Sequence, residues 1–208
     1  MSTPYTRSLV RLNTDKRILA LREGAKERRN PSADDETLNY LLFTVRCLKP
    51  KRILEIGTAE GISGAAMLLE APDAHLTTIE CDEEMYLRAK KNFEELGLSE
   101  RVDCVFADAA DVITSLEKPF DLIFLDGPKA QYLHYLPDLK RLLVKGGVLF
   151  ADDVLLFGWV SGEEPVPDKR RSIVRKIKEY LEAVSADEEL LTSVLHLGNG
   201  VAVSVKRN

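Results

Sequence analysis

Residues 52–64 read RILEIGTAEGISG, and this stretch decides the fold. Its first part, Arg52 to Ile56, is a short and mostly apolar run of the kind that forms buried strands. The run leads directly into Gly57, Gly61 and Gly64, whose lack of a side chain lets a ligand approach the backbone closely. A helix that starts after such a turn offers unpaired N–H groups to an anionic group. The stretch therefore predicts a strand, a binding turn and a helix in succession.

The same alternation of apolar runs and amphipathic stretches continues along the chain and predicts βαβ units around a parallel sheet. We expect strands at residues 52–56, 76–80, 102–107, 122–126 and 148–152, with helices between them, most clearly at 83–96 and 132–144. Gly97 and Gly146 stand where helix ends favour a residue that adopts positive φ. The predicted fold class is α/β, a single doubly wound Rossmann-like domain.

The two ends of the chain extend this plan. Residues 190–197 and 200–206 are apolar runs separated by Gly198-Asn199-Gly200, which predicts an antiparallel hairpin and a sheet of seven strands. A loop at 154–168 with Phe157 and Trp159 precedes a basic helix at about 169–183. Upstream, residues 8–28 and 34–47 are expected to form helices that cover the sheet. We therefore expect an N-terminal helical extension at 1–48 and the main domain at 49–208.

The composition is that of an ordinary globular protein, with 45% hydrophobic and 30% charged residues. No apolar run approaches the roughly 20 residues of a membrane span, so no membrane partner is expected. The N-terminus carries charges where a signal peptide would be apolar, which favours a cytoplasmic location. Cys47, Cys81 and Cys104 show no metal or disulfide spacing and are expected to be buried thiols.

Charge is distributed unevenly along the chain, whose formal net charge is −5. Residues 1–30 hold eight Lys and Arg against three Asp and Glu, and residues 169–178 (KRRSIVRKIK) hold six cations in ten positions. Such runs are often solvated helix faces, and a polyanion-binding role is the alternative. The sequence leaves both open.

Two acidic residues follow the glycine turn at the ends of the next two predicted strands. Glu80 ends the second strand, where a carboxylate accepts hydrogen bonds from ribose hydroxyls, and Asp108-Ala109 follows the third strand, where it would meet an adenine. Ligands of open α/β sheets bind at these strand ends. The glycine spacing is not the GxGxxG of dinucleotide binders, so the three features predict a nucleoside crevice of another kind.

Three carboxylates mark the ends of the fourth and fifth predicted strands. Asp126 ends the fourth strand and Asp152-Asp153 end the fifth, so they would repel one another unless a cation lies among them. Oxygen donors of this kind suit Mg²⁺ or Mn²⁺. Lys129 would project into the same crevice with a pKa lowered by a nearby cation and by partial burial, which makes it a candidate general base.

The motifs LEIGTAEGISG, TTIECD, FADA, FLDGPK and FADDV together resemble the cation-dependent class I O-methyltransferases, the family of catechol and caffeoyl-CoA O-methyltransferases. The resemblance covers about residues 35–208. Within the family the chain is most similar to the bacterial tRNA 5-hydroxyuridine methyltransferases, through LDGPKAQY, GGVLFADDVLLFGWV and KRRSIVRKIKEY. It implies a methyltransferase fold, S-adenosylmethionine and Mg²⁺ (or Mn²⁺) as cofactors, and a homodimer with the N-terminal helices as candidate surface.

The resemblance also implies the site residues. Lys129 would be the catalytic base, and Asp126, Asp152 and Asp153 would hold the metal. The cofactor would be bound by Gly57, Ala59, Gly61, Ser63, Glu80, Asp108, Ala109 and Asp126. The chain departs from the family at Asp153, where Asn is usual, so the extra charge should tighten cation binding. The segment Asn30-Pro31-Ser32 also matches the family poorly.

The expected reaction moves the methyl of S-adenosylmethionine to a hydroxyl that lies beside a second metal-chelating oxygen. The substrate favoured by the basic segments is 5-hydroxyuridine in tRNA, giving 5-methoxyuridine. A small catechol or phenylpropanoid presents the same five-membered chelate and is the main alternative. An NAD-dependent dehydrogenase and a non-catalytic cofactor-binding protein are the remote alternatives.

Overall fold

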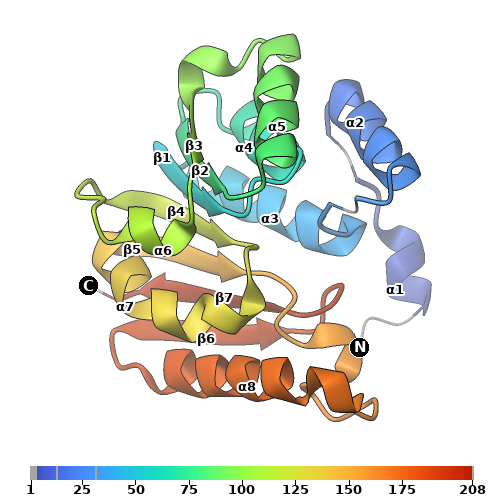
Figure 1. Cartoon of the computed structure of the whole chain (residues 1–208), viewed down its shortest axis with the longest axis vertical. Coiled ribbons are helices and arrows are strands. Elements are labelled where there is room, and N and C mark those ends of the chain that lie inside the picture. The colour runs from blue at the N-terminus through green and yellow to red at the C-terminus, as the bar shows by residue number, and fades with distance from the viewer. Residues whose placement is uncertain (1–3, 13, 31, 208) are drawn as a thin grey trace.

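A seven-stranded sheet lies between two layers of helices in the computed structural model, which describes residues 4–12, 14–30 and 32–207 (Figure 1). The strands are β1 (Arg52–Ile56), β2 (His75–Glu80), β3 (Val102–Phe106), β4 (Phe120–Leu125), β5 (Leu143–Ala151), β6 (Leu190–Leu195) and β7 (Val201–Lys206). The helices are α1 (Pro4–Leu9), α2 (Lys16–Glu27), α3 (Asp35–Leu48), α4 (Ile62–Glu70), α5 (Glu83–Glu95), α6 (Ala109–Ile113), α7 (Tyr132–Leu142) and α8 (Arg171–Ala186). Short 3₁₀ turns occur at Ser99–Arg101, Lys129–Gln131, Leu156–Gly158 and Asp168–Arg170.

The strand order is β3-β2-β1-β4-β5-β7-β6. β1 to β5 are parallel, whereas β7 runs antiparallel to both β5 and β6. The chain thus winds outward from β1 in both directions and closes with the hairpin predicted from Gly198-Asn199-Gly200. The predicted fold class, with its mostly parallel sheet and N-terminal helical cover, is confirmed. Because the parallel strands all end at the same edge, the loops that carry the acidic motifs are brought together.

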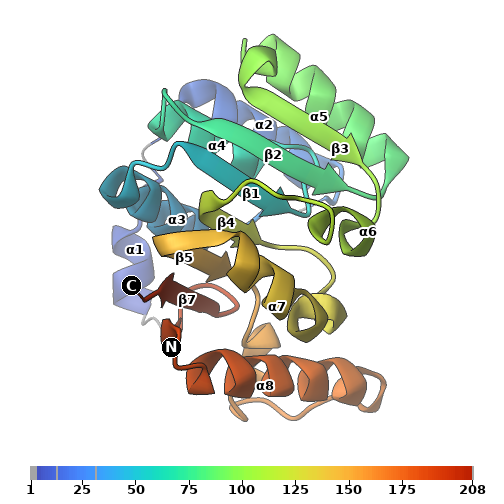
Figure 2. The same ribbon diagram turned by 90° about the vertical axis from the view of Figure 1, so that its left-hand side faces the viewer.

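Helices cover both faces of the sheet (Figure 2). One apolar core joins the sheet to α2, α3, α4 and α5, and a second joins it to α6, α7 and α8. Successive residues of a strand point to opposite faces, so Leu54 and Ile56 of β1 belong to one core and Ile53 to the other. This two-sided burial explains why the parallel strands are almost continuously apolar in sequence.

Aspartate side chains start several of the helices. Asp34 accepts a hydrogen bond from the backbone N–H of Thr37 at 2.9 Å and begins α3, and Asp82 accepts from Met85 at 3.0 Å and begins α5. Gly97, with φ of 71°, follows the end of α5 as expected. None of the helices in the described ranges combines the length and hydropathy that a bilayer crossing requires.

Three expectations from the sequence are wrong. The helix expected at 8–28 is divided into α1 and α2, because Asp15 accepts a hydrogen bond from the backbone of Arg17 and starts a new helix. β5 begins at Leu143, and Gly146, with φ of 76°, lies inside it next to a shift of register against β4. Cys47 and Cys81 are exposed rather than buried, since one lies on the outer side of α3 and the other follows β2.

Candidate functional site

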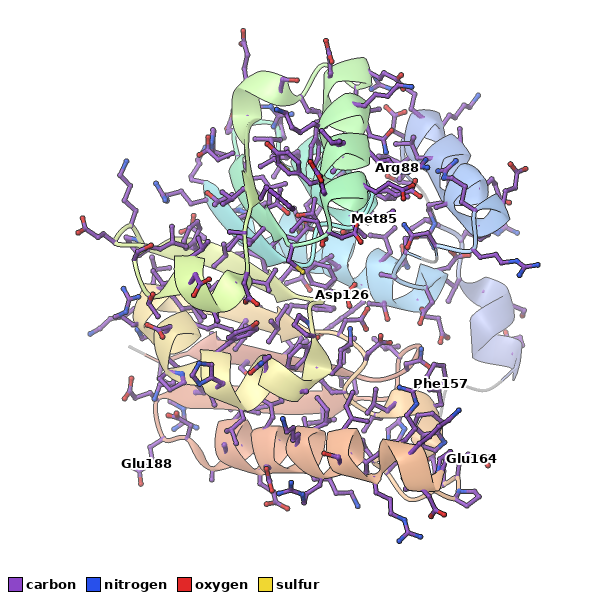
Figure 3. All side chains as sticks on the ribbon, in the orientation of Figure 1. Met85, Arg88, Asp126, Phe157, Glu164 and Glu188 are labelled. Carbon is purple, nitrogen blue, oxygen red and sulfur yellow. The ribbon has the colours of Figure 1, made fainter. Side chains whose placement is uncertain are left out.

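A cleft of about 640 Å³ opens at the carboxyl ends of the parallel strands. Figure 3 shows Asp126 at the centre of this side of the molecule, between Met85 of α5 and Phe157 of the loop after β5. Nine residues predicted for the site line the cleft: Gly57, Ala59, Glu80, Asp108, Ala109, Asp126, Lys129, Asp152 and Asp153. The topology therefore joins the predicted nucleoside crevice and the predicted carboxylate group in one cavity.

The glycine-rich turn after β1 is closely packed against the end of β4. Gly57 has φ of 96°, and a methyl group in place of its hydrogen would lie 2.5 Å from the carbonyl oxygen of Asp126. Ala59 also adopts a positive φ, of 45°, and its backbone N–H donates to Oε2 of Glu80 at 2.8 Å. The turn is thus fixed against both neighbouring strands.

Glu80 is held in a defined orientation at the end of β2. Its Oε1 accepts hydrogen bonds from the backbone N–H groups of Cys81 and Asp82, each at 2.9 Å. Each oxygen of a carboxylate has two lone pairs, so Glu80 retains acceptor capacity toward the cleft. Asp108 accepts from the backbone of Ala110 at 2.8 Å and caps α6, so it serves the helix while lining the cleft.

Two of the predicted cofactor residues do not line the main cleft. Ser63 lines a small adjoining hollow of about 30 Å³, and its hydroxyl donates to Oε1 of Glu55 at 2.5 Å. Gly61 begins α4 with φ of 75°, and a Cβ there would lie 2.9 Å from the ring of Phe93. Close packing against Phe93 therefore explains why a glycine occupies position 61.

Glu55 is a buried acid beneath the turn that the sequence reasoning missed. It lies in β1 with no exposed surface and also accepts a hydrogen bond from Thr78 at 2.7 Å. Burial raises the pKa of Glu55 to about 7, although the two hydroxyl donors oppose the shift. A charged residue inside an apolar strand was the only signal that could have identified it.

Two of the three predicted metal carboxylates, Asp126 and Asp153, pair with the ammonium group of Lys129, and Asp152 adjoins Asp153. Lys129 Nζ lies 2.6 Å from Oδ1 of Asp126 and 3.2 Å from Oδ2 of Asp153. Asp152 is 3% exposed, and its Oδ1 accepts from the backbone N–H of Asp153 at 2.7 Å. Burial and the neighbouring carboxylates raise the pKa of Asp152 well above its ordinary value, and burial also raises the pKa of Asp126.

The expectation of a lowered pKa for Lys129 is wrong for this arrangement. Burial by itself would lower the pKa, but the charges of Asp126 and Asp153 outweigh it and raise the pKa above the usual lysine value. The side chain is 14% exposed and lies 5.8 Å from the centre of the Tyr132 ring. Lys129 is therefore a well-shielded ammonium paired with two carboxylates.

The donor set fits a hard divalent cation. Asp126 and Asp153 pair with one ammonium and Asp152 adjoins Asp153, so these strand ends supply carboxylate oxygens of the kind that a hard divalent cation takes. Within the described ranges no three acidic, His or Cys side chains are already assembled as a ligand cluster. This agrees with the position of Lys129 Nζ between two of the carboxylates.

Several residues that the sequence analysis did not assign to the site also line the cleft. They are Ser32, Ala33, Asp34, Cys81, Tyr135 and Asn199. Burial raises the pKa of Tyr135 to about 12, so its phenol stays protonated. The segment that precedes α3 is anchored to the glycine turn, because Arg28 pairs with Glu60 and Asn30 donates to Glu60 at 3.2 Å. Ser32, Ala33 and Asp34 come from the N-terminal extension and Asn199 from the hairpin, which only the tertiary fold brings to the cleft.

Comparisons with known proteins agree on one family. A family described as O-methyltransferase matches residues 15–207. Caffeoyl-CoA O-methyltransferase of Populus kitakamiensis is 26% identical over 172 residues, which cover 79% of this chain and 73% of that protein. The chain is also similar to a solved structure from Staphylococcus aureus, provisionally assigned as a caffeoyl-CoA O-methyltransferase. The TM-score is 0.88 and the identity 31%, with 97% of each chain covered. The O-methyltransferase TomG of Streptomyces achromogenes, solved with S-adenosylmethionine, shares the fold with a TM-score of 0.83 and 24% identity, covering 98% of this chain and 95% of TomG.

Proposed function

Because the chain belongs to the O-methyltransferase family, we propose that its cleft transfers the methyl group of S-adenosylmethionine to a substrate hydroxyl beside a second oxygen. The observation that carries this proposal is the joining of two half-sites in one cavity. Glu80 and Asp108 lie at the ends of β2 and β3, and Asp126 and Lys129 follow β4.

The nucleoside half of the cleft suits S-adenosylmethionine. The fixed carboxylate of Glu80 is proposed to accept hydrogen bonds from the ribose hydroxyls, and Asp108 and Ala109 to contact the adenine. Because Gly57 has no side chain, the turn packs directly against the residues that follow β4, and the methionine part of the cofactor is proposed to lie beside this turn. Ser63 would contribute to cofactor binding from the adjoining hollow that it lines. Gly61 would contribute indirectly, because its packing against Phe93 supports the turn.

Asp126, Asp152 and Asp153 are proposed to hold Mg²⁺ or Mn²⁺. When bound, such a cation supplies Lewis acidity, lowering the pKa of a coordinated hydroxyl and orienting it. The protein contributes alignment, because the strand ends fix the carboxylates relative to the cofactor half of the cleft. Alignment of the attacking oxygen with the methyl group supplies much of the rate.

Lys129 is proposed to receive the proton of the substrate hydroxyl at Nζ. In the overall reaction an O–CH₃ bond forms, the S–CH₃ bond breaks, and S-adenosylhomocysteine leaves. Lys129 accepts a proton only in its neutral form, so its contacts with Asp126 and Asp153 must loosen in the working enzyme. The shielding of its side chain keeps the proton transfer away from bulk water.

The proposed substrate is 5-hydroxyuridine in tRNA, whose hydroxyl lies beside the O4 carbonyl. Phe157 lines the cleft, is 61% exposed, and offers a surface on which a base can stack. The same loop leads into the start of α8 (Figure 1). Exposed cations cluster there and suit phosphate contacts: Lys169, Arg170, Arg171, Arg175 and Lys178.

Ion pairing leaves part of this basic cluster available. Arg171 pairs with Asp168 and Arg175 with Glu179. In the described part of the chain, Lys169, Arg170 and Lys178 have no acidic side chain within ion-pair distance. Their charges are therefore open to a polyanion.

A small catechol or phenylpropanoid is the second candidate substrate. It is favoured by the caffeoyl-CoA O-methyltransferase of Populus kitakamiensis, since a phenol with adjacent oxygens would occupy the same half-site. Phe157 would stack on its ring as well as on a base. In that case the cations of α8 would form an ordinary solvated face.

Methyl transfer from labelled S-adenosylmethionine tests the proposal. The acceptors are bacterial tRNA that contains 5-hydroxyuridine, the same tRNA without it, and catechol, each with Mg²⁺ or with chelator. We expect chelator-sensitive transfer to the first acceptor. Transfer to catechol alone would establish the second candidate, and full activity in chelator would reject the metal assignment.

A further inference from the structure

The turn between β6 and β7 forms part of the cleft wall. Figure 1 shows this turn on the same side of the molecule as the loop that follows β5. Asn199, at the tip of the turn, lines the main cleft together with Asp152 and Asp153. It also lines a second hollow of about 580 Å³ with Arg22 and Asp34. Asn199 therefore stands where the two cavities meet.

The turn is held rigidly in this position. The carbonyl oxygen of Asn199 accepts a hydrogen bond from the backbone N–H of Leu155 at 2.8 Å, and that of Gly200 accepts from Val154 at 2.9 Å. Val154 and Leu155 directly follow Asp153, so the turn is tied to the carboxylate strand end. The turn is also closely packed against Leu155, since a Cβ on Gly200 would lie 2.3 Å from that side chain.

The other side of the turn is fixed against α3. Gly198 has φ of 53°, and a Cβ there would lie 1.6 Å from Oδ2 of Asp34, the residue that caps the helix. The backbone N–H of Gly198 donates to Glu36 at 3.2 Å. Asn199 is thus presented to the cleft by a turn that is clamped on both sides, which is the preorganisation that a recognition group needs.

The side chain of Asn199 suits recognition rather than structure. It is half-buried, and its amide makes no hydrogen bond to any of the residues that the structure describes. Asp34, Asp126, Asp152 and Asp153 all line the same cleft. An amide adds a donor and an acceptor to these carboxylates without adding charge, whereas a carboxylate would only accept.

We propose that the Asn199 carboxamide determines substrate specificity by hydrogen-bonding the imide edge of a pyrimidine ring. The neighbouring oxygens of that ring would lie at Asp126, Asp152 and Asp153. The inference rests on the proposed transfer to 5-hydroxyuridine and assigns the residue that reads the base. An imide edge presents an N–H donor next to a carbonyl acceptor, and a carboxamide complements this pair with its own C=O and NH₂. A catechol has no such edge beyond its two hydroxyls.

The test compares Asn199→Ala and Asn199→Asp with the wild-type protein and with Ser193→Ala, an exposed change on the same hairpin. The acceptors are an anticodon stem-loop RNA with a single 5-hydroxyuridine and catechol. We expect Asn199→Ala to lower kcat/KM for the RNA about tenfold, the scale of one or two lost hydrogen bonds. KM for S-adenosylmethionine and any transfer to catechol should change less than twofold.

Asn199→Asp should lower kcat/KM for the RNA further, because the carboxylate loses the donor and adds negative charge. Fluorescence anisotropy of the labelled RNA, with S-adenosylhomocysteine present, gives a readout that does not require turnover, and both variants should bind more weakly. Thermal unfolding confirms that the variants are folded. Equal loss for RNA and catechol, or no loss for either, would overturn the inference while leaving the methyltransferase assignment intact. A wild-type protein that transfers no methyl group to the RNA would instead refute the proposed substrate, and the inference with it.

Discussion

The phenolic hydroxyl of Tyr132 donates to the carbonyl oxygen of Asp152 at 3.2 Å. The same hydroxyl lies 2.9 Å from the carbonyl oxygen of Leu125, the residue before Asp126. One fully buried side chain at the start of α7 therefore links the ends of β4 and β5. These are the strand ends that carry the proposed metal ligands, so Tyr132 is in a position to set their spacing.

Tyr132→Phe should lower the free energy of unfolding by about 1 to 2 kcal/mol, because the carbonyl groups of Leu125 and Asp152 lose the single hydroxyl donor that they share. It should also weaken Mg²⁺ binding in the presence of S-adenosylhomocysteine. Urea unfolding measures the first effect and titration calorimetry the second.

Tyr180→Phe is the matched control. Tyr180 is equally buried and packs edge-on to Tyr132, with ring centres 5.4 Å apart, but its hydroxyl has no hydrogen-bond partner among the described residues. Its removal should leave stability unchanged or slightly raised. Equal effects of the two substitutions would show that Tyr132 acts only through packing.

Gly57→Ala should lower the free energy of unfolding by about 3 kcal/mol and abolish measurable cofactor binding. The new methyl group combines an unfavourable positive φ with a clash against the backbone of Asp126. Gly146→Ala has a similar φ, of 76°, but no atom within 4 Å of the new Cβ, so it should lose only about 1 kcal/mol. Urea unfolding and calorimetry with S-adenosylmethionine compare the pair. Similar losses would contradict the close approach of β1 and β4.

Glu55 predicts a pH dependence of stability. Its pKa is raised from 4.5 to about 7 in the folded state, so the folded protein binds a proton there more tightly than the unfolded chain does. The associated stability is present below pH 4.5 and is lost as the pH rises to about 7. The loss corresponds to about 3 kcal/mol.

Glu55→Gln removes this titration while keeping a polar group for Ser63 and Thr78. The stability of the variant relative to the wild-type protein should rise by about 3 kcal/mol between pH 4.5 and pH 8 and then stay constant. Urea unfolding at four pH values measures the difference, with the exposed Glu100→Gln as control. A constant difference across this range would show that Glu55 does not titrate as its burial indicates.

Much of the site could be predicted because it depends on local sequence and on a general property of parallel sheets. Buried strands were recognisable from their apolar runs, and the residues that follow them meet at one edge. Glu80, Asp126 and Asp152 were therefore placed correctly without knowledge of side-chain contacts. The boundaries of β5 and of the N-terminal helices were not predicted correctly, since register shifts and helix caps override average periodicity.

The remaining features depend on contacts between distant parts of the chain. Asp34 and Gly198 touch across more than 160 residues, and no local pattern marks either as part of a cleft. The pKa of Lys129 was misjudged for the same reason. Its direction depends on the distances to Asp126 and Asp153, and these exist only in the folded structure.

Asp153→Asn tests how charge at this position affects both the cation and Lys129. Removing one carboxylate charge should weaken Mg²⁺ binding about tenfold. Because the charge of Asp153 helps to raise the pKa of Lys129, the variant should have a lower lysine pKa. At saturating Mg²⁺ the acid limb of the kcat profile should then move to lower pH, since neutral Lys129 becomes available at lower pH.

Asp168→Asn removes an equal charge from an exposed site and controls for net charge. If the Mg²⁺ affinity falls but the acid limb of the kcat profile does not shift, Asp153 is a metal ligand and Lys129 is not the proton acceptor. An unchanged affinity would place the cation away from Asp153.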